Sequence, residues 1–127
     1  MTVERTDLIS ELINDTVEKY DAELVDLRRD LHTHPELSWS ELRTTDAVAT
    51  RVEQAGWTVT RAHRSGLVAD LGTEGPVVAL RADMDALPVQ DLTDDPWPST
   101  VTGVAHACGH DVPTAALVGA AHALAEV

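Results

Sequence analysis

The segment Val77-Val78-Ala79-Leu80-Arg81-Ala82 decides the fold class of this 127-residue chain, because it is the most continuously apolar of three strand-like runs. Such a run is typical of an interior strand whose two faces are both covered. Residues 57–61 and 67–71 form the other two runs, with turn residues between them. The pattern favours a layered α/β sheet with flanking helices over an open meander.

Helical periodicity lies on both sides of these runs. Over residues 3–32, apolar residues recur at spacings of three and four, which indicates one long amphipathic helix or two in series. The acidic side chains there mostly fall off the apolar stripe, so we interpret them as a solvated face. A second helix is expected to begin within 38–40, with Ser40 as its cap, and to end at Gly56 as a left-handed terminator. Small and apolar residues after Asp111 predict a third, closely packed helix.

Composition limits the kinds of partner. The net charge of −13, from 22 acidic residues against 9 basic ones, would repel a phosphate backbone and anionic lipid, so we expect neither nucleic acid nor a membrane as partner. The longest uncharged stretch, Val112 to Ala125, has 14 residues, fewer than the roughly 20 that a membrane-spanning helix needs. A single cysteine rules out an internal disulfide framework, and no signal peptide opens the chain, so the cytoplasm is the expected location.

The run from His106 to Asp111 concentrates the chain's only cysteine, two of its six histidines and a carboxylate. In an extended segment, residues two apart project to the same side, so Cys108 and His110 can converge on one ion. Thiolate and imidazole suit zinc or a similar transition metal. The alternative is a buried free cysteine beside incidental histidines, which the concentration of these residues within six positions disfavours. A Cys-His nucleophile remains a minor option.

Other polar side chains near this chemistry are Asp83 and Asp85, two residues apart just past the third strand-like run. They are placed to bind a metal or orient its ligand, or else to end the strand as turn residues. Asp111 precedes a helix and can cap it. The cluster of His32, His34 and Glu36 is best explained by histidines that contact the terminal carbonyls of the first helix.

Three segments of the chain, Leu27 to Ser38, Leu80 to Pro88 and Gly103 to Asp111, occur in the order found in the M20 metallopeptidase family. The chain resembles the N-terminal portion of that family's amidohydrolase branch, which includes aminoacylase, hippurate hydrolase and auxin-conjugate hydrolase. The resemblance runs from about residue 20 onward and into the last helix.

The resemblance implies a catalytic domain with two divalent metals, such as Zn, Mn, Co or Ni, that hydrolyses N-acyl amino acids. By likeness Cys108 and His110 would be metal ligands, Asp85 would support a ligand, and Asp83 would stand where other branches carry a liganding histidine. The metals would polarise the carbonyl and activate a water whose proton a glutamate takes. That glutamate, further histidines and a smaller dimerisation domain would all follow Val127.

Residues 1–127 are therefore expected to be the N-terminal portion of the metal-binding catalytic domain, without the dimerisation domain and the C-terminal part. The resemblance also implies that the full-length protein can form a homodimer. Pro113 stands where the branch usually has a histidine, although proline fits the first turn of a helix. We expect the fragment alone to be inactive, since a catalytic zinc typically has three protein ligands and two are present. The alternative is a non-catalytic remnant or assembly piece that needs another chain.

Overall fold

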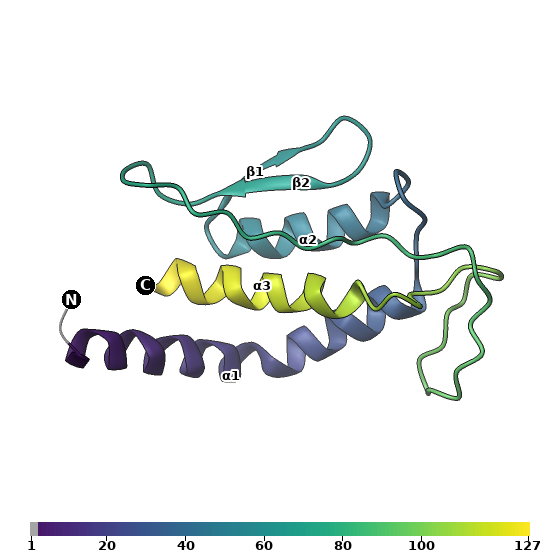
Figure 1. The fold of residues 1–127 in the computed structure, drawn as a ribbon, viewed down its shortest axis with the longest axis horizontal. Coiled ribbons are helices and arrows are strands. Elements are labelled where there is room, and N and C mark those ends of the chain that lie inside the picture. The colour runs from purple at the N-terminus through teal and green to yellow at the C-terminus, as the bar shows by residue number, and fades with distance from the viewer. Residues whose placement is uncertain (1–2) are drawn as a thin grey trace.

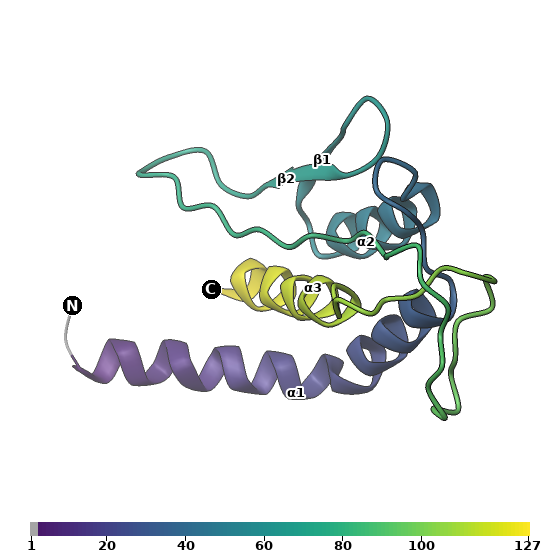
Figure 2. The same ribbon diagram turned by 45° about the vertical axis from the view of Figure 1, so that its right-hand side comes forward.

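The computed structural model describes residues 3–127 as three helices and one β-hairpin (Figure 1). The helices are α1 (Val3–Thr33), α2 (Leu42–Gln54) and α3 (Asp111–Glu126), and the strands are β1 (Thr58–Arg61) and β2 (Leu67–Asp70). Both ribbon views stack the elements in the order α1, α3, α2 and hairpin (Figure 2). The expected α/β class is confirmed, and the first helix is a single continuous one.

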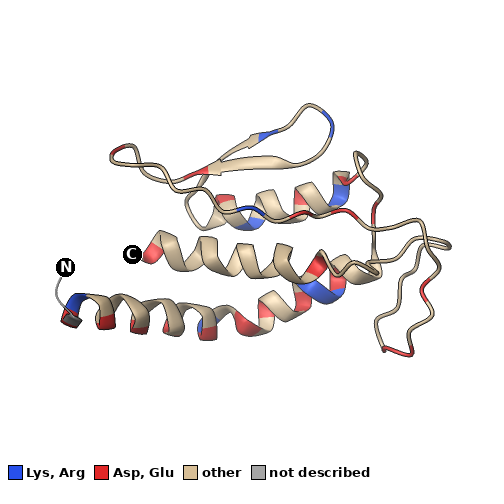
Figure 3. Cartoon of the chain, in the orientation of Figure 1, with Lys and Arg blue, Asp and Glu red and all other residues tan. Residues whose placement is uncertain are grey.

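The core lies where α1 and α2 pack on the two sides of α3. Leu27 and Leu31 of α1 are fully buried, as are Val118 of α3 and, nearly, Val52 of α2. Figure 3 shows why α3 takes the central place: it carries charge only at its two ends, whereas acidic residues are spread along α1. Burying an apolar side chain of this size stabilises the fold by about 1.5–3 kcal/mol.

The start of α2 differs from the prediction that Ser40 caps it. The N-cap position is Glu41, whose side chain makes no capping bond, and the helix begins at Leu42. The Glu36 carboxylate supplies the acceptors instead, because it receives the backbone N–H groups of Arg43 at 2.9 Å and Thr44 at 2.7 Å. Glu36 therefore satisfies donors that a helix leaves without partners in its first turn. At the other end, Gly56 has the expected left-handed backbone, with φ of 93°.

The prediction of a third strand at residues 77–82 is wrong. The two strands within residues 3–127 pair antiparallel with each other, from Thr58 opposite Asp70 to Arg61 opposite Leu67. Residues 77–82 belong to no strand within this described part, and Val77 and Val78 are 93% and 85% exposed. An interior strand needs cover on both faces, whereas residues 77–81 are exposed and border a groove of about 1320 Å³ that α2, α3 and the hairpin also line.

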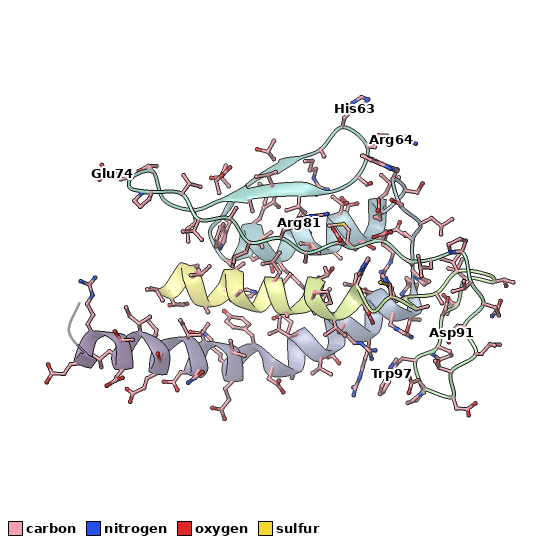
Figure 4. The ribbon with its side chains drawn as sticks, viewed as in Figure 1. His63, Arg64, Glu74, Arg81, Asp91 and Trp97 are labelled. Carbon is pink, nitrogen blue, oxygen red and sulfur yellow. The ribbon has the colours of Figure 1, made fainter. Side chains whose placement is uncertain are left out.

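A long loop separates this segment from α3, as predicted for residues 86–103. Leu87 and Ala105 exchange backbone hydrogen bonds at 2.9 and 3.0 Å, which closes the loop at its neck. Within the loop, Trp97 packs under the Arg29 guanidinium of α1, at 4.1 Å from the ring centroid (Figure 4). The loop is therefore fixed against the end of α1 and returns to the start of α3. Within residues 3–127 no helix combines the length and the apolarity that crossing a membrane requires.

Candidate metal centre

His110 and Asp85, singled out separately in the sequence, meet at the start of α3. The His110 Nδ1 lies 2.9 Å from Asp85 Oδ1 and 3.0 Å from the Asp85 carbonyl oxygen. Both partners are acceptors, so Nδ1 carries the proton and Nε2 carries the lone pair. A carboxylate in this position fixes the tautomer and the orientation of a metal-binding imidazole. The geometry thus prepares Nε2 of His110 to act as a ligand.

The backbone explains why Asp85 reaches this place. The Thr114 hydroxyl in the first turn of α3 donates to the Asp83 carbonyl at 3.0 Å, and the Ala86 N–H donates to the Glu36 carbonyl at 2.8 Å. These two bonds hold the chain on either side of Asp85. The Asp83 carboxylate lies outside this contact and pairs with the largely exposed guanidinium of Arg81.

Cys108 is exposed and is a free thiol. It precedes His110 by two residues across Gly109, whose φ of 79° is a left-handed value that glycine adopts readily. Among residues 3–127, no group of three or more His, Cys, Asp or Glu side chains is arranged to hold a metal ion. The sulfur of Cys108 and the free nitrogen of His110 suit a soft or borderline metal, and as a pair they fill only part of its coordination shell.

A buried ionic cluster beside these residues was not foreseen. Asp111, which is 1% exposed, places its Oδ2 2.9 Å from both His32 Nδ1 and Arg28 Nε of α1. His32 donates a hydrogen bond, while Arg28 forms an ion pair whose N–H is not aligned for one. Asp111 is the first residue of α3, so its predicted role as a cap is wrong, and its side chain is engaged by α1 instead.

The helix-end interpretation holds for one of the two histidines. His34 Nδ1 bonds to the carbonyl oxygen of Asp30 at 2.9 Å, as expected at the end of α1. His32 instead reaches Asp111, 79 residues away. The missed signal is the spacing of Arg28 and His32, four apart on one helix face beside the buried Leu31. Two polar residues on a buried face call for a buried counter-charge.

His106 and a small cavity extend this cluster. A cavity of about 120 Å³ is lined by His32, Asp91 and His106, among others. Burial lowers the pKa of His106, and its two ring nitrogens have no hydrogen-bond partner among the described residues. Hydrogen bonds to the Asp91 carboxylate lower its pKa to about 2, and the bond from the Ser99 backbone N–H has a larger effect than those from Thr93. Asp91 therefore stays ionised, whereas burial disfavours the charged form of His106 on the same cavity.

Comparison with known proteins finds relatives along most of the chain. The family model described as peptidase family M20/M25/M40 matches residues 79–127. A Bacillus subtilis N-acetylcysteine deacetylase is 45% identical over 77% of the chain. A Rhodococcus jostii protein, provisionally named glutamate–cysteine ligase 2-3, is 48% identical over 87% of the chain, which amounts to 14% of that protein. The name of that relative therefore describes a much longer protein, and this chain matches only a small part of it.

The fold comparison agrees with the sequence. The crystal structure of a dinuclear metal-binding peptidase of the M20 family from Bacillus subtilis matches with a TM-score of 0.80 and 40% identity. The match covers 85% of this chain and 31% of the peptidase. The chain spans between 14% and 31% of the length of the curated relatives that it matches, including 27% of the deacetylase.

Proposed function

We propose that this chain, which belongs to the M20 family of peptidases, supplies two metal ligands to an amidohydrolase that cleaves the amide bond of N-acyl amino acids. The single observation that carries the proposal is the hydrogen bond from His110 to Asp85, because it orients an imidazole as a ligand two residues after the exposed Cys108 thiol. The dinuclear centre named for the matched peptidase supports two divalent ions in the whole protein.

Each residue has a distinct part in this proposal. Cys108 and His110 bind metal, and Asp85 accepts the Nδ1 proton of His110 so that Nε2 remains basic. Asp83 is a further candidate ligand, although its carboxylate pairs with Arg81 in this structure. Bound divalent metal polarises an amide carbonyl and lowers the pKa of a bound water. The base that takes the proton of that water lies outside the residues proposed here.

The substrate class rests on the relatives. The matched deacetylase is named for N-acetylcysteine, an N-acyl amino acid. The net charge of −13 disfavours polyanionic partners and leaves small molecules as the expected substrates. From composition, we propose that the protein is cytoplasmic. From the resemblance, we propose that residues 1–127 are part of a catalytic domain and that the full-length protein forms a homodimer.

Metal binding tests the proposal directly. The 127-residue chain is titrated with Co²⁺, and the absorption from thiolate to cobalt is recorded. We expect weak binding with that band, which Cys108→Ser and His110→Gln remove. His63→Gln is the matched control, because His63 sits on the exposed hairpin turn (Figure 4). A titration in which Cys108→Ser keeps the wild-type band would refute the ligand assignment.

Catalysis by the isolated chain is expected to be absent, because two side chains do not complete a catalytic zinc site. The assay is hydrolysis of an N-acetyl amino acid with Zn²⁺, Mn²⁺ or Co²⁺ added in turn. The same assay on a protein that continues this sequence to the length of its relatives is expected to show turnover. Turnover by the 127-residue chain alone would show that the proposed division of the site is wrong.

A second function, as an assembly piece, is favoured by the exposed segment 77–82. Its valines are in solvent and its backbone lies beside an apolar groove, so it is suited to pair with a β-strand from a further part of an M20 protein, on the same chain or on another. Sedimentation of the chain at increasing concentration is expected to show association that Val78→Lys abolishes and Leu8→Lys, exposed on α1, does not. A strictly monomeric wild-type chain would reject pairing of this segment with a second copy of residues 1–127.

A further inference from the structure

We propose that Asp111 is a positioning residue, which sets the place of Cys108 and His110 by holding their loop against α1. The inference rests on the proposed function, because it concerns the same two ligands. Asp111 follows His110 directly, and its carboxylate is bound by two side chains of another element. A change at Asp111 therefore acts on the ligands through the backbone, without touching a metal.

The attachment to α1 is buried and charged. One oxygen, Oδ2, lies 2.9 Å from both Arg28 and His32, and the Asp111 side chain is almost completely inaccessible to water. Arg28 and His32 are four residues apart on one face of α1, so they present a positive charge and a hydrogen-bond donor, respectively, to the same oxygen. Because water does not reach the carboxylate, no water molecule can replace these two partners, and the carboxylate stays in contact with them.

The other side of the loop is fixed independently. The His110 ring is bound to Asp85, and the Gly109 N–H donates to the His106 carbonyl at 3.1 Å. The first turn of α3 then follows, with the Thr114 N–H bonded to the His110 carbonyl at 3.1 Å. His110 is thus held by its ring on one side and by the Asp111 attachment on the other. Removing either support frees the imidazole to turn, and removing the Asp111 attachment also frees the loop that carries Cys108.

The test compares two carboxylates that both join α1 to another element. Asp111→Asn keeps the shape of the side chain and removes its charge, and we expect the Co²⁺ affinity of the 127-residue chain to fall by about 10–100-fold, as for other groups that orient metal ligands. Asp30→Asn is the control, because Asp30 binds Arg43 of α2 through both oxygens and does not contact the loop. Its Co²⁺ affinity is expected to stay within about twofold of wild type.

The cobalt spectrum separates positioning from general destabilisation. Urea unfolding first identifies conditions under which each variant is folded, and the absorption band is then compared at saturating Co²⁺. A positioning role predicts a shifted or weakened thiolate band in Asp111→Asn and an unchanged band in Asp30→Asn. Equal affinities and identical bands in both variants would overturn the inference while leaving Cys108 and His110 as ligands.

Two further outcomes are decisive. If Asp111→Asn does not fold, Arg28→Lys provides the same test, because it keeps the charge but changes the contact with Asp111; an affinity equal to wild type would again overturn the inference. If the wild-type chain shows no thiolate band and Cys108→Ser changes nothing, the proposed ligand pair fails and the positioning role falls with it. The two failures are thus distinguished by the wild-type titration alone.

Discussion

Replacement of Val78 by alanine tests the most unexpected feature of the fold, the exposure of an apolar segment. Val78 is 85% exposed, so only about 15% of its side chain is removed from water. Full burial of a valine is worth about 1.5–3 kcal/mol, and the remaining contact is therefore worth ~0.2–0.5 kcal/mol. We expect Val78→Ala to lower the free energy of unfolding by no more than this amount.

The matched substitution is Val118→Ala, at a valine that is 1% exposed. Here the burial of two methyl groups, about 1.6 kcal/mol, is lost and a cavity is added, while alanine recovers up to ~0.7 kcal/mol of helix propensity, so the net loss is about 2 kcal/mol. Urea unfolding followed by circular dichroism measures both variants, with the midpoint compared at constant slope. A loss of about 1 kcal/mol or more in Val78→Ala would refute the exposed arrangement, because only packing on a second face accounts for it.

Three further results are expected. Burial lowers the pKa of His122 below its usual 6.5, chiefly through desolvation where the ring stacks on Tyr20. As the pH falls, the unfolded chain takes up this proton before the folded chain does, so the contribution of His122 to stability is complete above about pH 6.5 and is lost at lower pH. Thermal unfolding of His122→Gln should therefore show a smaller loss of stability between about pH 7.5 and 5 than wild type. His106, whose pKa is also lowered, contributes a loss in the same direction to both proteins. Trp57→Phe removes the indole N–H that donates to the Ala121 carbonyl at 2.9 Å, and calorimetry should find about 1 kcal/mol less stability, whereas an unchanged value would show that water replaces the bond. Asp91→Ala removes the acceptor for the Thr93 and Ser99 backbone N–H groups, so a protease should cut the loop faster than in wild type; equal rates would mean that the neck alone orders the loop.

The sequence was sufficient wherever one periodicity acted alone. The stripe that contains Leu27 and Leu31 predicted the helical span of α1, as one helix or two in series. The small residues of α3 predicted its close packing, and Gly119 allows Leu24 to approach so closely that an added Cβ would lie 2.8 Å from its Cδ1. Local turn chemistry also sufficed at Gly56. These features depend on neighbours in the chain, so a window of a few residues contains the necessary information.

Predictions failed where a distant partner decides the structure. Glu36 reaches across to the first turn of α2, so Ser40 is not needed as a cap. Asp111 finds its partners in α1, which no spacing near Asp111 reveals. The strand expected at 77–82 needs neighbours on both sides, and the hairpin strands within residues 3–127 pair with each other. Asp85 and His110 were both noticed, yet their hydrogen bond depends on how α3 meets the preceding segment.

The neck between Leu87 and Ala105 gives the protein a natural insertion point. A segment that leaves and returns through one closed pair of residues changes little in conformational entropy when it is lengthened, because doubling such a loop costs only about 0.6 kcal/mol. Asp94 and Asp95 at its exposed tip are therefore suitable places to graft an epitope or a dye-binding peptide. Such a graft would report on the chain without entering the packing between α1 and α3.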